Sequence, residues 1–281
     1  MLEIVLEDWQ HFLRKVEELE RAEFASGART AYIYRGVPRS TYGLKPSLLR
    51  LFEERGIADP VLALAIEAHA GREFIRRAHL HLSPGIFAAA ERRFGEDLGP
   101  DCIHWWTLMQ HHSAPTRLLD WTRSAFVAAY FAVEKDSTED GAIWALDANE
   151  LSKRVGGAKS MPSPDRFAET ILSPKTSEAI WTIERPRATE RIVAQQVVFT
   201  MAERILTDHG VRLAQIAGGD NQVFLRMIVG RALKPMFLAR LRKMNIGANA
   251  LFPGPDGLGR STSETARLFQ WQPTQGGGSP R

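Results

Sequence analysis

Apolar residues recur at helical spacing close to the start of the chain. One face of this stretch carries Trp9, Phe12, Leu13, Val16 and Leu19. The spacing predicts a helix over residues 5–24, and Gly27 is its expected end. Comparable patterns predict further helices over residues 60–80, 85–95, 101–112, 123–134, 221–231 and 234–244.

Short runs rich in β-branched and aromatic residues predict strands between these helices. They span residues 31–35, 143–146, 179–183, 192–200 and 213–217. Gly36 follows the first run, so Arg35 is expected at a strand end that leads into a loop. Residues 152–165 and the last ten residues are rich in Gly, Ser and Pro, which predicts a surface loop and a disordered tail. This mixture of elements, without an internal repeat, predicts a single α+β domain with a central mixed or antiparallel sheet.

The composition narrows the class of protein. Of 281 residues, 44% are hydrophobic and 25% are charged, as in ordinary globular proteins. The single cysteine, Cys102, excludes an intramolecular disulfide framework; it is either a nucleophile or a small buried hydrophobe. The N-terminus lacks the pattern of a signal peptide and no apolar run has the length of a membrane span. We therefore expect a cytoplasmic protein without a membrane partner. The net charge of +3 fits an anionic partner without requiring one.

Polar and aromatic side chains crowd into residues 110–122, directly before the apolar run Ala125–Val133. The segment contains two histidines, an arginine, an aspartate, threonines and a tryptophan. Polar groups beside a buried helix are costly unless they satisfy one another or bind a ligand. We expect a site here, with Asp120 to Thr122 capping the helix that follows.

Each candidate in this region has a structural and a functional interpretation. Arg35 offers a planar fork to a phosphate or carboxylate, or ties loops together through backbone carbonyls. His111 is either a general base or a neutral histidine held by a carbonyl. A metal site is not expected, because His111 and the adjacent His112 diverge on a helix and only Asp120 is near enough to be a third ligand.

The remaining candidates are equally open. Arg117 and Asp120 are three residues apart and form either a local ion pair or two parts of a site. In the site, Asp120 orients His111 or Arg35, and Arg117 meets an anionic ligand. Trp121 stacks on a flat ring or belongs to the core. Thr122 and Ser124 are candidates for capping the next helix at an anion-binding end.

Several motifs together resemble the FRG domain family, named after a Phe-Arg-Gly tripeptide. Tyr34-Arg35-Gly36 stands at the place of that tripeptide, and Pro46-Ser47-Leu48 and the run from Gln110 to Thr122 follow. Later likenesses are Arg191 to Gln195 and Leu251 to Gly257. The resemblance covers roughly residues 30–260. It implies an α+β domain there with a helical insertion at about 56–109. An N-terminal helix over 1–29 precedes it, and a C-terminal extension and tail over 261–281 follow.

The order of these motifs is also similar to ADP-ribosyltransferases of the Arg-Ser-Glu class, whose core the central sheet is expected to resemble. That likeness implies NAD as substrate, with Arg35 holding it and Thr122 or Ser124 matching the second motif. The third motif departs from the pattern, because Gln195 stands where that class has a catalytic glutamate. Glutamine carries no negative charge for a developing cation. Glu184 and Glu190, just before the expected strand, are possible replacements.

Together these arguments predict NAD-dependent ADP-ribosyl transfer or NAD cleavage, in a toxin or phage-defence setting that rests on the resemblance alone. The expected catalytic residues are His111, Asp120 and Gln195. The expected cofactor-binding residues are Arg35, Gly36, Gln110, Arg117, Trp121 and Thr122. The alternative is a non-catalytic module that binds a nucleotide or nucleic acid. The expected partners are thus a nucleotide ligand and a nucleic-acid or protein target.

Overall fold

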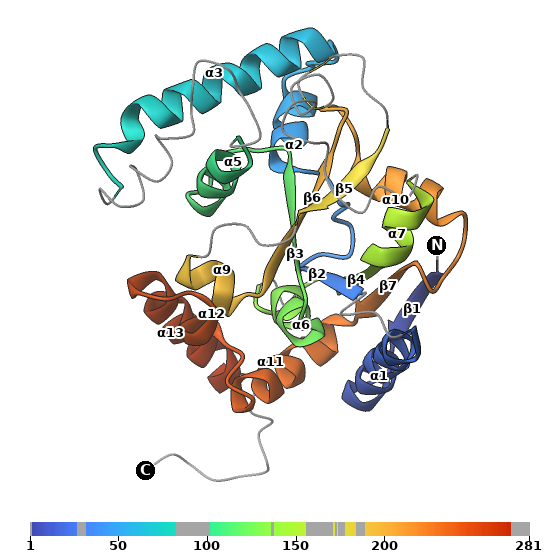
Figure 1. Cartoon of the computed structure of the whole chain (residues 1–281). Helices are drawn as coiled ribbons and strands as arrows, with labels where there is room; N and C mark the ends of the chain where they lie inside the picture. The colour runs from blue at the N-terminus through green and yellow to red at the C-terminus, as the bar shows by residue number, and fades with distance from the viewer. Residues whose placement is uncertain are drawn as a thin grey trace, which may run out of the picture.

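The computed structural model describes residues 2–26, 32–82, 102–135, 138–155, 171, 173, 178–183 and 189–270. It has an α+β fold in which helices surround one seven-stranded mixed sheet (Figure 1). The predicted helix over 85–95, the helix end at Gly27, Glu184, the C-terminal tail and most of the loop over 152–165 lie outside the described residues.

The sheet has the strand order β1-β7-β4-β2-β3-β6-β5. The strands are β1 (Leu2–Leu6), β2 (Tyr32–Val37), β3 (Leu118–Thr122), β4 (Gly141–Asp147), β5 (Ile180–Ile183), β6 (Val197–Ala202) and β7 (Phe224–Val229). β1 and β7 are parallel, and the other neighbouring pairs are antiparallel.

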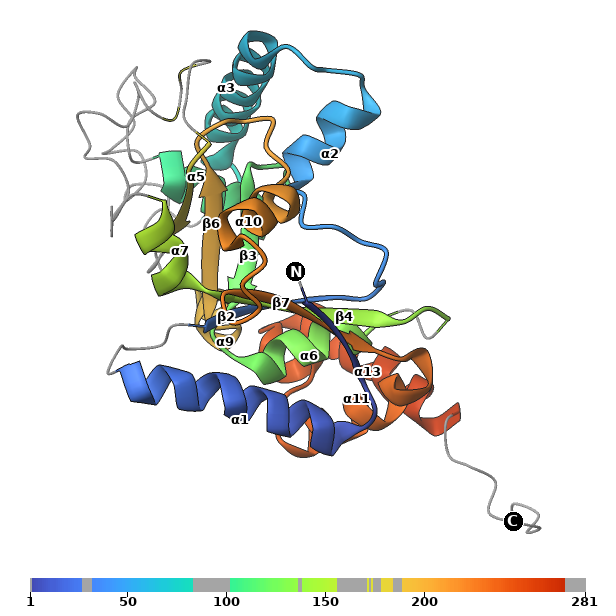
Figure 2. The same cartoon turned by 90° about the vertical axis from the view of Figure 1, so that its right-hand side faces the viewer.

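The sheet divides between its two central neighbours. β2 and β3 pair at one position, Tyr34 opposite Thr122, whereas β2 pairs with β4 along its whole length. Beyond Tyr34 the two strands separate. In both views β3 and β6 run across the direction of β2, β4 and β7 (Figures 1 and 2). The two groups of strands therefore leave an opening on the side of Arg35 and Asp120.

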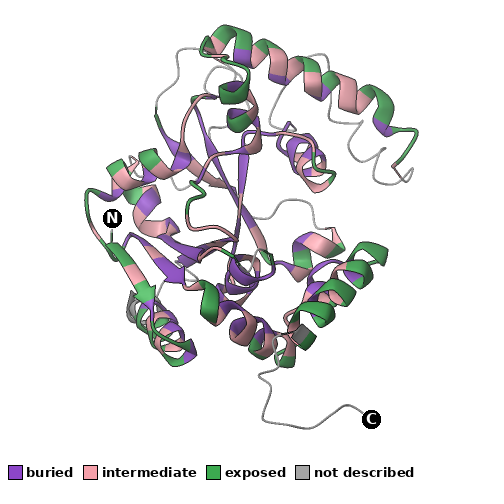
Figure 3. Ribbon diagram, turned by 180° about the vertical axis from the view of Figure 1, so that it is seen from behind, coloured by how far each residue is buried: buried purple, intermediate pink, exposed green. Residues whose placement is uncertain are grey.

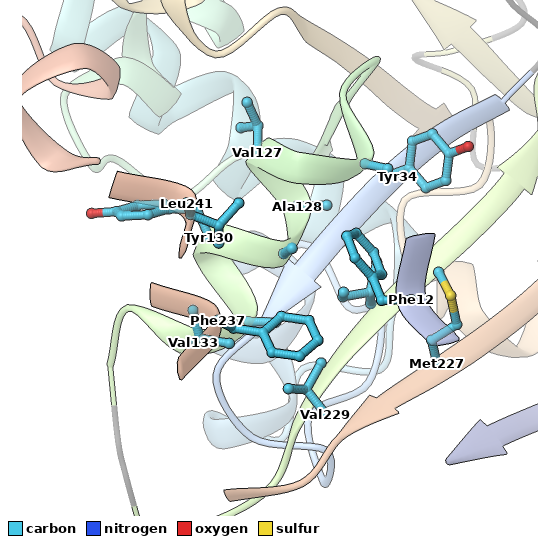
Figure 4. Packing of buried hydrophobic residues seen from close by; sticks show 14 of the residues in the cluster. Phe12, Tyr34, Val127, Ala128, Tyr130, Val133, Met227, Val229, Phe237 and Leu241 are labelled. Carbon is cyan, nitrogen blue, oxygen red and sulfur yellow. The ribbon is translucent and has the colours of Figure 1, made fainter. Parts of the chain in front are cut away.

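Helices cover both faces of the sheet. The helices are α1 (Trp9–Ser26), α2 (Ser47–Glu54), α3 (Pro60–Ala78), α5 (Cys102–His111), α6 (Ala125–Val133), α7 (Ala148–Arg154), α9 (Glu190–Ala194), α10 (His209–Ala217), α11 (Lys234–Lys243), α12 (Ala248–Leu251) and α13 (Pro255–Gln270), with a short 3₁₀ helix at Arg231–Leu233. The largest apolar cluster packs α1, α6 and α11 against β2, β4 and β7 (Figure 4). A second cluster, under α7 and α10, includes Trp121, Trp144 and Phe224 from the opposite face.

Helix α6 lies unusually close to the sheet. A Cβ placed on Gly36 would be 1.8 Å from the carbonyl oxygen of Ala128, and one on Gly141 would be 2.2 Å from that of Ala132. Only glycine permits this approach of helix to strand, because any side chain would meet the helix backbone. Gly36 is thus required for the packing of α6.

A third cluster joins α5 to the other group of strands. Met109 and Trp106 from α5 pack with Leu118, Phe199 and Met201 from β3 and β6. These strands and α6 are mostly buried, whereas α3 and α13 carry exposed faces (Figure 3). The packing places the end of α5, with Gln110 and His111, beside β3.

Several sequence predictions are wrong in informative ways. Asp120 to Thr122 form the end of β3 rather than a cap, and Ser124 caps α6 by accepting from the amide of Val127 at 3.2 Å. Residues 213–217 belong to helix α10, whereas the predicted helix over 221–231 contains strand β7. The predicted strand over 192–200 begins only at Val197, because α9 precedes it. The N-terminal helix is preceded by β1, which the pattern did not reveal.

Candidate functional site

A cavity of about 380 Å³ opens where β2 and β3 separate. Its walls come from β2, β3, the end of α5, the segment before α2, the α9–β6 turn and the C-terminal helices. Of the sequence candidates, it is lined by Arg35, Gly36, Gln110, His111, Asp120, Trp121, Thr122 and Gln195. Its volume falls in the range of small-molecule sites.

The carboxylate of Asp120 is held from both sides of the opening. Gln110 of α5 donates from Nε2 to Asp120 Oδ2 at 2.8 Å, and Arg35 Nη1 lies 3.7 Å from the same oxygen. Arg35 Nη1 also donates to the backbone carbonyl of Asp120 at 2.6 Å. Thr116 fixes the amide of Gln110 by donating its hydroxyl to Gln110 Oε1. Asp120 is thus a positioned carboxylate, and its side chain is still 47% exposed.

Arg35 lies inside β2, whereas the sequence predicted it at a strand end. Its side chain is mostly buried, and burial lowers the pKa of the guanidinium while Asp120 opposes that shift. Its Nε is buried without a hydrogen-bond partner among the described residues. Arg35 connects the two groups of strands, because β2 and β3 meet in the sheet only at Tyr34 and Thr122.

His111 ends helix α5 at the rim of the cavity. Burial lowers the pKa of its imidazole, and the positive charges of Arg191 and His112 add to the shift. The ring is therefore neutral at pH 7, the form in which histidine accepts a proton.

The cavity is strongly cationic. Six basic side chains line it, against two carboxylates. The basic residues are Arg35, Lys45, Arg50, Lys135, Arg191 and Arg260. The acidic residues are Asp120 and Glu134. Such an excess of cations in a concave site favours an anionic ligand.

Arg117 is the candidate that the structure places elsewhere. Its guanidinium is buried and forms a two-pronged ion pair with Glu67 of α3, fifty residues upstream, and not with Asp120. It also donates to the carbonyl of Ile171 at 2.9 Å and lies over the ring of Trp106. Arg117 therefore holds α3 and α5 against β3, and no part of it lines the cavity.

The other candidates have clear structural partners as well. Gln195 lies in the turn after α9 and not on a strand, and its Nε2 donates to the carbonyl of Leu251 at 2.8 Å. Trp121 is buried in the core and donates to Thr200 at 2.9 Å. The hydroxyl of Thr122 accepts from the amide of Ser124 at 3.1 Å. These contacts fix the cavity wall. Cys102, the first residue of α5, is buried in the third apolar cluster and does not line the cavity.

One lining carboxyl was missed by the sequence analysis. Glu134 follows the last residue of α6, and its side chain is only 10% exposed. Burial raises the pKa of Glu134, and the hydroxyl of Tyr130 lies 3.2 Å from its Oε2. The only available signal was a charged residue ending an apolar helix. Glu190, a predicted replacement for the missing glutamate, is exposed and does not line the cavity.

Within the described ranges, no group of three or more His, Cys, Asp or Glu residues is arranged to hold a metal ion. In the same part of the chain, none of the helices combines the length and apolar character needed to cross a membrane.

The comparisons with known proteins identify one domain. Residues 30–141 match the model of the FRG domain. No curated protein and no solved structure matches the chain. The match ends at the start of β4, so the segments 191–195 and 251–257, which carried the rest of the resemblance, lie beyond it. Arg35, Gln110 and Asp120 all lie within the segment that matches the FRG domain model.

Proposed function

We propose that the protein cleaves NAD at the bond between ribose and nicotinamide and passes the ADP-ribosyl group to water or to a macromolecular target. The observation that carries this proposal is the Asp120 carboxylate, which Arg35 and Gln110 hold at the wall of a cationic cavity. The resemblance to ADP-ribosyltransferases motivates NAD as the substrate. The cationic lining suits its diphosphate.

The chemistry assigns one role to each polar group. When the bond from the ribose carbon to the nicotinamide nitrogen breaks, its electron pair leaves with nicotinamide and positive charge develops on the ribose. A fixed carboxylate stabilises that charge more in the transition state than in the ground state. Asp120 supplies this charge in place of the late glutamate that the sequence lacks. His111, neutral at pH 7, accepts the proton of the attacking hydroxyl as the new bond forms.

Arg35 and Gln110 act through Asp120. Because Arg35 Nη1 is bound to the carbonyl and lies near the carboxylate of Asp120, Arg35 is a positioning residue here and not a phosphate clamp. Gln110 orients the same carboxylate from α5. The carboxylate can then meet the substrate without first reorganising, which is the main source of electrostatic catalysis.

The test is release of nicotinamide from NAD, measured with the protein alone and with added nucleic acid or cell extract. Asp120→Asn keeps the shape of the side chain and removes its charge, so we expect release to fall by about 10²–10³-fold. Glu190→Gln is the matched control, because Glu190 is an exposed carboxylate outside the cavity. Equal rates for the two variants, or no release by the wild type in any mixture, would refute the proposal.

The excess of basic lining residues also supports a second candidate, a non-catalytic module that binds a nucleotide or nucleic acid. That module would bind nucleic acid with an affinity that falls steeply with salt and would turn nothing over. A steep salt slope together with no nicotinamide release would favour it. A toxin or phage-defence setting remains our proposal on the family resemblance alone.

A further inference from the structure

Two arginines form a second charged region in the cavity, on the wall made by α9 and the C-terminal helices. The guanidinium of Arg191 lies 4.9 Å from the ring centre of Phe252, and that of Arg260 lies 4.0 Å from it. The ring is itself fixed by an edge contact with Phe131. Both arginines line the cavity, and both lie over this one aromatic ring at its wall.

The charge of this pair is only partly compensated. Arg260 lies 3.5 Å from Glu134, which also lies 3.9 Å from Lys135. Arg191 has no hydrogen bond or ion pair with any described residue; it lies over the face of Phe252, and its charge is offset at longer range by Asp120, Asp256 and Glu134. Burial and the charge of Arg260 lower the pKa of Arg191. Two partly buried cations over one ring, only one of which has a carboxylate within ion-pair distance, favour the binding of an anion.

The other cations of the cavity are already engaged. Arg35 is bound to Asp120, and Lys45 pairs with Glu53 at 2.8 Å and with Asp208 at 3.8 Å. Arg50 donates to the carbonyl of Lys45 at 2.6 Å. Of the lining cations, Arg191 therefore has the guanidinium most available to a ligand.

We propose that Arg191 and Arg260 together bind the diphosphate of a nucleoside diphosphate or dinucleotide. Each guanidinium offers a planar set of donors that matches phosphate oxygens, and two adjacent guanidinium groups match two linked phosphates. Arg191 is also close enough to His111 to lower the pKa of its imidazole. A ligand held by this pair therefore extends past His111 towards Asp120. The choice of dinucleotide rests on the proposed function, whereas the diphosphate contact does not.

Calorimetric titration with ADP tests the diphosphate contact without any turnover. We expect Arg191→Gln and Arg260→Gln each to weaken ADP binding by about tenfold or more, the effect of losing one charge-assisted contact. The matched control is Arg240→Gln, because Arg240 also stacks on an aromatic ring, Trp9 at 5.8 Å, but is exposed and lies outside the cavity. Inorganic pyrophosphate should compete with ADP on the wild type. Thermal melting of each variant verifies that it is folded.

The outcomes separate this inference from the proposed function. Loss of ADP binding in Arg191→Gln, with no nicotinamide release by the wild type, supports the diphosphate site and refutes NAD cleavage. Nicotinamide release with an unchanged KM in Arg191→Gln supports NAD cleavage and overturns the site. The inference also fails if the wild type does not bind ADP, if Arg191→Gln and Arg240→Gln bind it equally, or if only an oligonucleotide binds in an Arg191-dependent way.

Discussion

Gly36, the last residue of the motif that gives the FRG domain its name, has a measurable structural role. A Cβ at this position would be 1.8 Å from the carbonyl oxygen of Ala128 and 2.8 Å from the amide nitrogen of Ala132. Ordinary contact of a Cβ begins at 3.4 Å, so α6 would have to retreat by about 1.6 Å in a tightly packed interior. We therefore predict that Gly36→Ala strongly destabilises the fold.

The size of the effect follows from what α6 contacts. Seven of its nine residues are buried, and they pack against the sheet and α11. A shift of the helix would open gaps throughout that cluster. Overpacking against side chains costs about 1–3 kcal/mol, and here the clash is with backbone, so we expect a loss of about 3 kcal/mol or more. In a chain of this size the melting temperature should fall by about 6–12 °C.

Urea unfolding of Gly36→Ala measures the loss of free energy of unfolding, and Gly43→Ala is its matched control. Gly43 is exposed, and a Cβ there would have nothing within 4 Å. We expect Gly43→Ala to change the free energy of unfolding by no more than about 0.5 kcal/mol. If the two variants have the same unfolding midpoint, the close approach of α6 does not explain the glycine.

Two further predictions concern buried charge. Glu67→Gln leaves the Arg117 guanidinium buried without its counter-ion, so it should lower the free energy of unfolding by about 3–5 kcal/mol. The control Glu73→Gln, on the more exposed face of α3, should change the free energy of unfolding little. Equal unfolding midpoints of the two variants in urea would contradict this. Burial lowers the pKa of His209 to about 3, so between about pH 6.5 and pH 3 only the unfolded chain binds the proton, and acidification should reduce stability by up to about 1.4 kcal/mol per pH unit. His209→Asn should flatten that decline, and parallel stability curves for the variant and the wild type would refute the assignment.

The α+β class and five of the described helices, α1, α3, α5, α6 and α11, could be predicted from the sequence by their apolar periodicity, whereas α2 and α13 were not predicted. The predicted helix over residues 60–80 starts where α3 starts and ends two residues after α3 ends at Ala78. The predicted helix over residues 234–244 starts where α11 starts and ends one residue after it. Short strands failed for a physical reason. Leu118–Thr122 is a buried strand of five residues whose polar Asp120 faces an opening created by distant segments. Nothing local distinguishes such a strand from a helix cap. β7 and α10 were exchanged because both are short apolar runs without a clear period.

For the site, the sequence could predict the region but not the partner of each side chain. The dense polar run from Gln110 to Asp120 marked the correct region, because such groups need partners. Which partner each would find depends on tertiary contacts. Arg117 and Asp120 are three residues apart, yet one pairs with Glu67 and the other with Arg35. Their positions explain this: Arg117 lies just before β3, where Glu67 of α3 reaches it, whereas Asp120 lies within β3, where Arg35 of β2 reaches it.

The Arg35–Asp120 contact also explains why a structural and a functional interpretation of Arg35 need not exclude each other. β2 and β3 pair at one position in the sheet, so the hydrogen bond from Arg35 to the backbone of Asp120 is a second link between the two groups of strands. The same link fixes the carboxylate at the mouth of the cavity. Both contacts come from the same atom, Nη1 of Arg35, which donates to the carbonyl of Asp120 and lies near its carboxylate. Two neighbouring residues of β2 thus have separate roles: the glycine admits α6, and the arginine bonds to Asp120 across the separation of the two strands.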